Sequence, residues 1–538
     1  MVEGSFLWEK ELTADMVTKT MADGRVITTF PDLPGSLYEA LKKTAGVLPD
    51  KTALVTDEGR HCSYRQLLTY SEGLAEYLSE IKGVGRGCHV GIMMHNTLEF
   101  CTAVFSLSKL GAVTAALPSK FRKPEVLALA RRADLKLVLC EEAYGEWFTE
   151  LCGREAVITT AENGCDCGYE NLLPQGRKKK SMENTVMPSE GRPEDAAFLL
   201  FTSGTTAQSK GVLLKNYQIA HGIEAYRRIL HISEKDSSVI ATPIYHITGL
   251  AALLGLFITV GGILYLHKTF QAKRVLADAQ KYGFTFLHGS PAVFHLLMQE
   301  GADRVRLPGL VSAACGSGNM AKDKLLRFHT WLPHTAFHTV YGLTETSSPA
   351  AIFPGDAAKS PCIGASGKPI PGMCFRIVDD SGQELPAGSA GEIVIKGSNV
   401  IDAYYGQPET ENGWLYTGDI GYFNEQGYLY VVDRKKDMIN RGGEKIWCYD
   451  VENELELLEE IQNSAVVGIP DELYGEAAAA MVELRKGSAL TAEDIRRHLE
   501  TRIAKYKIPV KIKMVDAIPQ TQNGKIDKNE VRNQLIKE

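Results

Sequence analysis

Short apolar runs alternate with segments of helical periodicity through the first two-thirds of the chain. The apolar runs predict buried strands at residues 90–94, 112–117, 135–140, 196–201, 283–288 and 311–315. Between them apolar residues recur at helical spacing, as Leu67, Leu74 and Leu78 do behind the capping box of Ser63 and Gln66. Strands that alternate with helices predict a layered α/β domain with a substantially parallel sheet.

A capped helix and a long uncharged stretch add to this pattern. Asn96 and Glu99 predict the cap of another helix, which would end at Gly111 because glycine accepts the left-handed backbone of a helix terminus. Residues 249–266 carry no charge and reach the length of a membrane span. The glycine pair at 261–262 divides them into pieces that are each too short to cross a bilayer. We therefore expect a buried helix followed by a strand, and no membrane span.

Beyond Pro369 the pattern changes to that of antiparallel strands. Runs at 375–378 and 392–396 flank a turn at 380–382 and predict a hairpin. Residues 414–432 continue with aromatic strands that glycines interrupt. A β-rich subdomain is therefore expected to close the large domain.

The end of the chain has a core pattern of its own. A charged connector at 434–437 precedes strands at 464–469 and 477–484 and two apolar helical stripes. The stripes are Val451, Leu455 and Leu458, and Ile495, Leu499 and Ile503 after a cap at Thr491. About a hundred residues suffice for an independent domain. We expect a large domain at 1–433 and a small α+β domain at 434–538.

Composition and charge exclude several classes of protein. The 538 residues are 44% hydrophobic and 23% charged, and the net charge of -7 gives no attraction to nucleic acid or anionic membranes. The eleven cysteines are scattered without a zinc spacing and indicate free thiols. The basic run at 177–180 indicates a solvated linker. Because the first residues show no signal peptide, a cytoplasmic location is expected.

A loop rich in hydroxyls follows the strand at 196–201. It contains Thr202, Ser203, Gly204, Thr205, Thr206 and Lys210. Backbone N–H groups, hydroxyls and one ammonium can hold a polyphosphate after such a strand, although a solvated turn would have the same composition. Gly211 after Lys210 excludes a Walker loop, which requires Ser or Thr at that position.

Other short motifs carry groups suited to nucleotide or acid chemistry. They are the turn with Tyr341, Gly342, Thr344 and Glu345, the turn that ends in Asp419, His246, and Lys525 on a glycine-bearing tail loop. An aromatic face can stack a base, and carboxylates can hold a divalent metal or accept ribose hydroxyls. Taken singly, each motif would be an ordinary turn, a structural histidine or a solvated lysine.

Together the motifs resemble those of the adenylate-forming superfamily, which includes acyl-CoA synthetases, adenylation domains and luciferases. They follow the family's order across about 49–525 of the chain, at 202–211, 245–250, 316–318, 341–346, 416–419 and 519–526. The resemblance implies layered α/β subdomains, a β-rich subdomain of distorted-barrel type, and a small mobile C-terminal domain.

The resemblance also implies a role for each motif. The loop of Thr202, Ser203, Gly204, Thr205, Thr206 and Lys210 would bind the phosphates of ATP, with Thr205 and Glu345 on Mg²⁺ and Thr344 on the α-phosphate. Tyr341, Gly342, Gly316, Ser317 and Gly318 would surround adenine, and Asp419 with Arg434 would hold the ribose. His246 would gate the acyl pocket. Lys525 would stabilise charge on the attacking carboxylate, a task that suits a compact ammonium.

A moving small domain is part of the same resemblance. It places the pivot at Lys436 and turns Gly442 and Gly443 toward the pantetheine tunnel after the domain swings. Asp433, Cys448 and Asp450 stand where family members commonly have Gly, Pro and Glu.

The implied activity is that of an AMP-forming carboxylate–CoA ligase. An acid and ATP would give an acyl-adenylate, and the thiol of coenzyme A would then displace AMP. A stand-alone enzyme that loads a separate carrier protein is one alternative. A catalytically silent homologue is the other, and the presence of Lys525, Glu345 and Asp419 together argues against it.

The acid is expected to have an uncharged tail. An α-amino acid would require a carboxylate partner for its ammonium, and 240–266 contains no acidic residue. The implied lining of the acyl pocket is small and mainly apolar: Thr248, Gly249, Ala252, Ala314, Gly316 and Val340. We expect a medium-sized aliphatic or aromatic acid, with acetate a poor substrate, and the pattern does not choose between fatty, arylpropenoic and polycyclic tails.

Overall fold

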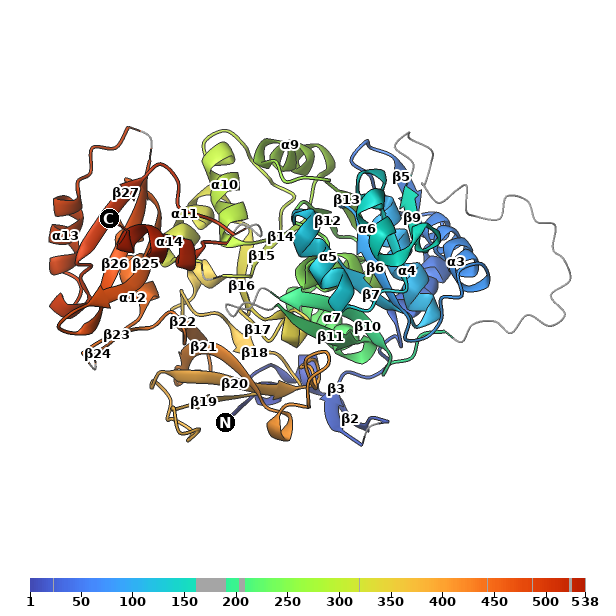
Figure 1. Ribbon diagram of the computed structural model, residues 1–538, viewed down its shortest axis with the longest axis horizontal. Helices are drawn as coiled ribbons and strands as arrows, with labels where there is room; N and C mark the ends of the chain where they lie inside the picture. The colour runs from blue at the N-terminus through green and yellow to red at the C-terminus, as the bar shows by residue number, and fades with distance from the viewer. Residues whose placement is uncertain are drawn as a thin grey trace, which may run out of the picture.

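The predicted alternation of strands and helices builds a six-stranded sheet in the N-terminal lobe, which we define as residues 1–434 (Figure 1). The computed structural model describes residues 1–22, 24–160, 190–202, 209–318, 320–442, 444–485, 487–521 and 525–537. The sheet order is β11 (Lys210–Lys215), β10 (Ala196–Thr202), β7 (Val113–Ala116), β6 (His89–Met93), β8 (Leu137–Glu141) and β9 (Val157–Thr160). Neighbouring strands are parallel except for β10 and β11. The predicted parallel α/β sheet is confirmed.

Two smaller sheets extend this α/β body. One contains β12 (Ser237–Ile240), β13 (Ile263–Leu266), β4 (Thr52–Val55) and β5 (His61–Ser63). The other contains β14 (Phe286–Gly289), β15 (Ser312–Cys315), β16 (Ala336–Tyr341), β17 (Ala351–Ile352) and β18 (Lys368–Pro369). They meet where the Thr285 amide donates to the Ser237 carbonyl over 3.1 Å.

The helices of the N-terminal lobe confirm one predicted cap and correct another. These helices include α2 (Leu37–Val47), α3 (Tyr64–Glu80), α4 (Leu98–Leu110), α7 (Asn216–Leu230), α10 (Pro291–Gly301) and α11 (Lys322–Trp331). The capping box of Ser63 and Gln66 is present at the start of α3. The cap predicted at Asn96 is wrong, because the Thr97 hydroxyl accepts from the Phe100 amide at the start of α4. A hydroxyl one residue later fits the cap geometry, and this leaves Asn96 buried for another role.

The long uncharged stretch forms the predicted helix and strand. It begins with a π-helical segment, η4 (Thr248–Gly255), continues as α8 (Leu256–Val260) and ends at Gly261, whose φ is 83°. Strand β13 then enters the sheet. Within the described ranges no helix is long and apolar enough to cross a membrane.

A five-stranded antiparallel sheet joins the two ends of the N-terminal lobe. Its order is β1 (Val2–Glu3), β19 (Met373–Val378), β20 (Gly391–Gly397), β21 (Leu415–Phe423) and β22 (Leu429–Arg434). Val2 pairs with Phe375, and the Trp8 indole donates to the Pro369 carbonyl over 2.7 Å, although Trp8 and Pro369 are 361 positions apart. The predicted β-rich subdomain is confirmed, and its first strand comes from the start of the chain.

The C-terminal lobe, residues 439–537, has its own sheet and core (Figure 1). The sheet contains β24 (Glu444–Ile446), β23 (Ile439–Arg441), β26 (Gly475–Leu484), β25 (Ile461–Asp471) and β27 (Lys511–Val515), and the helices are α12 (Cys448–Glu456), α13 (Ala492–Glu500) and α14 (Lys528–Ile536). Leu458 and Ile503 lie past the ends of α12 and α13, so the helix prediction is wrong for these two. Both still pack against the core of the lobe.

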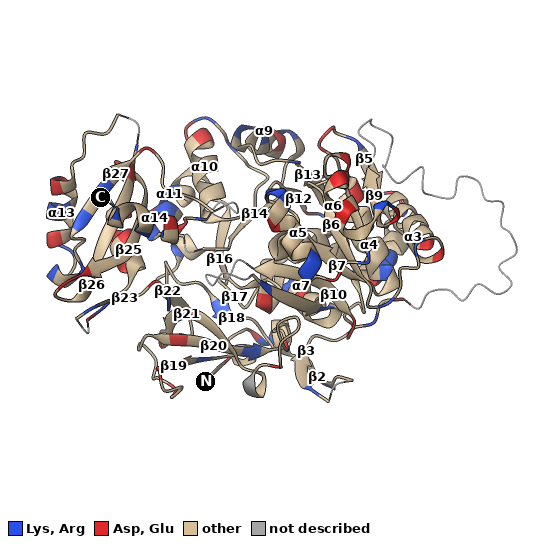
Figure 2. Cartoon of the chain, in the orientation of Figure 1, with Lys and Arg blue, Asp and Glu red and all other residues tan. Residues whose placement is uncertain are grey.

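Charged residues of both signs are interspersed over the two lobes, as Figure 2 shows. This distribution agrees with the low net charge of the sequence.

Candidate active site

Many of the predicted site residues come from the carboxyl ends of parallel strands and from two pairs of antiparallel strands. Tyr341 ends β16, and Gly316 and Ser317 follow β15, so both segments lie at the same edge of their sheet. Asp419 and Arg434 face each other across β21 and β22. Thr202 and Lys210 likewise pair across β10 and β11. The loop between them contains four of the predicted residues, which lie outside the described residues: Ser203, Gly204, Thr205 and Thr206. Gly443, in the C-terminal part of the chain, is also outside the described residues.

Asp419 is held by one side chain on each oxygen. The Tyr341 hydroxyl donates to Asp419 Oδ2 over 2.8 Å, and Arg434 Nε lies 2.7 Å from Oδ1. The Asp419 side chain is only 4% exposed. Its burial raises the pKa of the carboxyl, and the charge of Arg434 opposes that rise. The aromatic ring predicted to stack on adenine is therefore joined directly to the carboxylate predicted to bind ribose.

Glu345 lies beside the strand that carries Lys210. The Tyr404 hydroxyl donates to Glu345 Oε1 over 3.0 Å, and Lys210 Nζ lies 4.6 Å from the centre of the Tyr404 ring. Tyr404 also forms an isolated β-bridge with Val212 of β11. The sequence analysis did not identify Tyr404, because no motif includes it and only the folded chain brings it between the two predicted groups.

Lys525 reaches this group of residues from the C-terminal lobe. The Thr521 amide donates to the Lys525 carbonyl over 2.7 Å, which closes the tail loop. The Lys525 residue is exposed. Partial desolvation of its ammonium, followed by the charge of Arg434, lowers the pKa of that group. The carboxylates of Asp419 and Glu345 act in the opposite direction. One cation and two anions from three distant segments thus lie close enough for their charges to affect one another.

His246 belongs to the same constellation. Burial, together with the positive charges of Lys525 and Lys120, lowers the pKa of its imidazole to about 4. The ring is therefore neutral at pH 7, and its centre lies 4.6 Å from that of Tyr245. A neutral ring adds no charge to the site, so it can exclude water and donate or accept a hydrogen bond.

Asn96 fixes the backbone that carries His246. Its Oδ1 accepts from the Ile244 amide over 2.8 Å, and its Nδ2 lies 2.8–3.0 Å from the carbonyl oxygens of Ile240, Thr242 and His267. This buried amide joins β12 and β13 to the segment before η4. The residue that was predicted to be a helix cap is therefore the anchor of the predicted gate.

The predicted acyl-binding residues lie on two elements. Ala314 and Val340 are buried on β15 and β16, and Ala252 is buried in η4, which begins at Thr248. At Gly249 a methyl group would lie 2.7 Å from the Ile244 Cα, so glycine permits η4 to approach the 244 backbone. At Gly316 the nearest atoms to an added methyl are 3.4 Å away or more, which is ordinary contact distance.

Polar contacts between the lobes hold the C-terminal lobe in its present orientation. Lys324 Nζ on α11 lies 2.9 Å from Glu456 Oε2 on α12, and the two side chains are 16% and 18% exposed. Asp433 lies three positions before Lys436 in the chain. Its Oδ2 accepts a hydrogen bond from the Cys448 amide at the start of α12 over 2.6 Å. Burial raises the pKa of the Asp433 carboxyl to about 6. Gly442 lies apart from these contacts, where its amide donates to the Tyr474 carbonyl over 2.8 Å.

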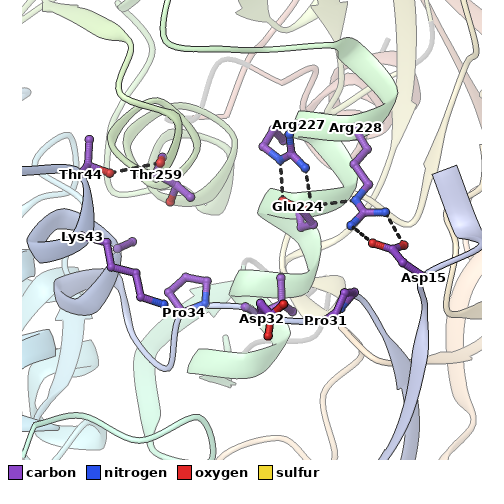
Figure 3. Close-up of a pocket in the computed structure, with 12 residues that line it drawn as sticks. Asp15, Pro31, Asp32, Pro34, Lys43, Thr44, Glu224, Arg227, Arg228 and Thr259 are labelled. Carbon is purple, nitrogen blue, oxygen red and sulfur yellow. Dashed lines mark hydrogen bonds and ion pairs between the residues drawn. The ribbon is translucent and has the colours of Figure 1, made fainter. Parts of the chain in front are cut away.

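A separate cavity of about 440 Å³ lies between residues 31–34, α2 and α7 (Figure 3). Four of its charged residues pair with one another: Arg228 contacts Asp15 and Glu224, and Arg227 contacts Glu224. None of the residues predicted from the motifs lines this cavity. We therefore assign the chemistry to the constellation around Lys525.

Comparison with known proteins gives consistent matches over nearly the whole chain. Residues 41–405 match the model of the AMP-binding enzyme family, and 450–525 match that of the AMP-binding enzyme C-terminal domain. An indoleacetate–CoA ligase of Aromatoleum aromaticum is 30% identical, over 93% of this chain and 98% of that protein. An oxalate–CoA ligase of Arabidopsis thaliana is 28% identical, over 93% of this chain and 99% of that protein.

Two solved structures show the same fold. The o-succinylbenzoate CoA synthetase of Bacillus subtilis in complex with an acyl-adenylate intermediate has a TM-score of 0.80 and 26% identity, over 92% of this chain and 97% of that one. ATP-bound MatB of Rhodopseudomonas palustris has a TM-score of 0.83 and 25% identity, over 93% and 98%. The predicted fold, a layered α/β lobe with a β-rich sheet and a small C-terminal lobe, is confirmed.

Proposed function

Because this chain belongs to the AMP-binding enzyme family, we propose that it is an AMP-forming carboxylate–CoA ligase that activates a carboxylic acid with ATP and transfers the acyl group to coenzyme A. The observation that carries the proposal is the convergence of Lys525, His246, Glu345 and Asp419 from four separate segments. The names of its relatives, ligases of indoleacetate, oxalate and succinylbenzoate with CoA, support the same reaction class.

In the first half-reaction a carboxylate oxygen of the acid attacks the α-phosphorus of ATP, and the bond to pyrophosphate breaks. Both reactants are anions, so the site must neutralise charge and hold them in line. Lys525 is the cation that the C-terminal lobe delivers to this point. We assign it the stabilisation of the attacking carboxylate, and we assign Thr344 a contact with the α-phosphate.

The nucleoside would bind where Tyr341 and Asp419 are joined. We propose that the Tyr341 ring stacks on adenine beside Gly316, Ser317, Gly318 and Gly342, and that Asp419 with Arg434 accepts the ribose. The Tyr341 hydroxyl and Arg434 hold the carboxylate in one orientation before ATP arrives, which reduces the entropy lost on binding. Thr202 and Lys210 stand at the two ends of the proposed phosphate loop.

Mg²⁺ fits the carboxylate of Glu345. Mg²⁺ prefers oxygen ligands and commonly takes one or two carboxylates together with substrate phosphates and water. Tyr404 fixes Oε1, and among the described residues Oε2 has no hydrogen-bond partner. Among the described residues, no group of three or more His, Cys, Asp or Glu side chains could hold a metal ion. When bound, Mg²⁺ would neutralise phosphate charge.

In the second half-reaction the thiol sulfur of CoA attacks the acyl carbon, the bond to AMP breaks, and the thiol proton leaves. We propose that residues 434–538 first reorient about Lys436 as a mobile domain. This motion would withdraw Lys525 and bring Gly442 and Gly443 to the thiol. Separation of the two lobes at the Lys324–Glu456 and Asp433–Cys448 contacts would be required, because both contacts join the lobes in the present arrangement.

We also propose a cytoplasmic location. The nine cysteines that the structure describes are all free thiols, which suits a reducing compartment. CoA, rather than a carrier protein, is the thiol donor that the names of the relatives support.

The test is to incubate the full-length protein with Mg·ATP and a panel of acids, with and without CoA. We expect pyrophosphate release with medium-sized acids that have uncharged tails, and acyl-CoA and AMP when CoA is present. Fastest release with an α-amino acid or with acetate would overturn the proposed acyl pocket. The proposed activity would be overturned if none of the acids supported pyrophosphate release.

A further inference from the structure

His288 is a buried polar side chain with an unmet hydrogen-bonding atom. It lies on β14 and is 7% exposed. Its Nε2 lies 3.4 Å from the Tyr226 hydroxyl, whereas Nδ1 is buried without a partner among the described residues. Buried polar atoms are nearly always paired, and an unpaired one costs about 1–3 kcal/mol. A ligand that supplies the missing partner would explain why the chain retains this arrangement.

The position of His288 relates this atom to the proposed acyl site. His288 is in register with Ala314 of the parallel strand β15, so the two side chains point to the same face of the sheet. A methyl group on Gly316 would lie 3.6 Å from His288 Cε1 and 3.7 Å from Val340 Cβ. Ala314, Gly316 and Val340 are three of the residues that are expected to line the acyl pocket. His288 therefore lies among them.

Two hydroxyls complete a polar cluster around His288. The Tyr226 hydroxyl of α7 lies 3.1 Å from Ser348 Oγ as well as 3.4 Å from His288 Nε2. The imidazole stands edge-on to the Tyr226 ring and to Phe286, with ring centres 5.9 and 6.2 Å apart. Aromatic walls and a short chain of hydrogen bonds thus fix the direction in which Nδ1 points.

The cluster suits a neutral ligand atom. Burial lowers the pKa of His288 to about 4, so the ring is uncharged at pH 7. A neutral imidazole donates at one nitrogen and accepts at the other, and the hydroxyl of Tyr226 can either donate to Nε2 or accept from it. Nδ1 can therefore accept from a hydroxyl or donate to an oxo group. A carboxylate at this point would be an unpaired buried charge, which is far more costly.

We propose that His288 is a specificity-determining residue whose Nδ1 forms a hydrogen bond to a neutral oxygen, a hydroxyl or oxo group, on the tail of the acid substrate. The inference rests on the proposed function, because it requires an acyl group on the face of Ala314, Gly316 and Val340. It narrows the expected substrate from uncharged-tail acids to oxygenated ones.

The experiment compares matched acids that differ by one oxygen. Suitable pairs are 3-phenylpropanoate with its ring-hydroxylated forms, cinnamate with the hydroxycinnamates, and hexanoate with the oxohexanoates. The readout is kcat/KM for pyrophosphate release. We expect the wild-type protein to favour the oxygenated member of at least one pair by about tenfold to a hundredfold, the range for a site that leaves a polar group unpaired with the wrong substrate.

Variants then test the residue itself. His288→Phe should reduce that ratio to about one, His288→Gln should retain part of it, and Tyr226→Phe should lower it without abolishing turnover. His338→Gln is the matched control, because His338 is equally buried on β16 but already bonds the Phe353 carbonyl over 2.9 Å. Thermal unfolding of each variant checks the fold. If His288→Phe does not fold, the ratios of His288→Gln and Tyr226→Phe provide the test.

Three outcomes would overturn the inference. One is a wild-type preference for the deoxygenated member of every pair, which would mean that a buried water already satisfies Nδ1. The second is an unchanged ratio in all the His288 and Tyr226 variants that fold. The third is that no acid of the panel supports pyrophosphate release. That result would also overturn the proposed function, and it differs from the first two outcomes because no kcat/KM ratio could then be measured.

Discussion

The ion pair between Lys324 and Glu456 gives the sharpest test of the link between lobe orientation and chemistry. The pair joins α11 of the N-terminal lobe to α12 of the C-terminal lobe, with 2.9 Å between Nζ and Oε2. The orientation that it supports is the one in which Lys525 interacts with Asp419 and Glu345. Lys324→Met should therefore weaken adenylation and leave thioester formation intact.

The magnitude follows from the burial of the pair. Removing one partner of a fully buried ion pair costs about 3–5 kcal/mol. Here about a sixth of each side chain is exposed. Burial already raises the pKa of Glu456, so the isolated acid could take up a proton instead of remaining charged. We scale the cost to about 2 kcal/mol, which is about thirtyfold in the equilibrium between the two orientations.

The assay measures the half-reactions separately. Adenylation is followed as pyrophosphate release in a single turnover without CoA, and thioester formation as acyl-CoA produced from supplied acyl-adenylate. We expect adenylation by Lys324→Met to fall about tenfold to thirtyfold. The exchanged pair, Lys324→Glu with Glu456→Lys, should recover most of the loss because it restores opposite charges.

A matched control lies within the C-terminal lobe. Lys507 and Asp450 form a pair of similar geometry, 2.7 Å apart, that does not cross between the lobes. Lys507→Met should therefore affect the two half-reactions equally or not at all. An equal fall of both half-reactions in Lys324→Met, or unchanged adenylation in a folded variant, would refute the reasoning.

Three further predictions concern single residues near the same junction. Lys525→Ala should slow adenylation by about a hundredfold, the scale of losing one electrostatic stabiliser, and spare thioester formation from supplied acyl-adenylate; equal losses in both steps would give Lys525 a structural role instead. Lys436→Pro fixes one φ angle, so adenylation should persist while thioester formation fails, and normal overall turnover would move the pivot elsewhere. The pKa of Asp433 is raised from 3.8 to about 6 in the folded protein, which therefore binds the proton more tightly than the unfolded chain does. The free energy of unfolding should fall as the pH rises from about 4 to 6. Asp433→Asn should remove that fall in thermal-unfolding scans, and an unchanged pH profile would contradict the assignment.

Local patterns in the sequence predicted most of the elements. Apolar runs predicted the buried strands because a strand inside a parallel sheet is covered on both faces. The box of Ser63 and Gln66 predicted a helix start correctly, since its hydrogen bonds span three residues only. At Asn96 the same reasoning failed. Thr97 offered an equivalent cap one residue later, and tertiary contacts determined which of the two was used.

The site also contains residues that local motifs predicted and residues that only tertiary contacts reveal. The motifs and the resemblance named Glu345, Asp419 and Arg434, but they could not name Tyr404, whose hydroxyl donates to Glu345. Tyr404 reaches Glu345 only in the folded chain, where it bridges to Val212 of β11. His288 carries no motif at all. Its significance lies in an unpaired nitrogen, which is a property of packing and has no signal in the order of the residues.

The pairing of the first strand with β19 has a consequence for how the protein is made. A ribosome synthesises Val2 and Trp8 hundreds of residues before their partners, Phe375 and Pro369. Throughout that interval this apolar segment has no sheet to join, and closure over so long a loop is slow. Val2 and Trp8 can therefore take their places only after the strands of the antiparallel sheet have been translated, and they are among the last of the N-terminal lobe to fold.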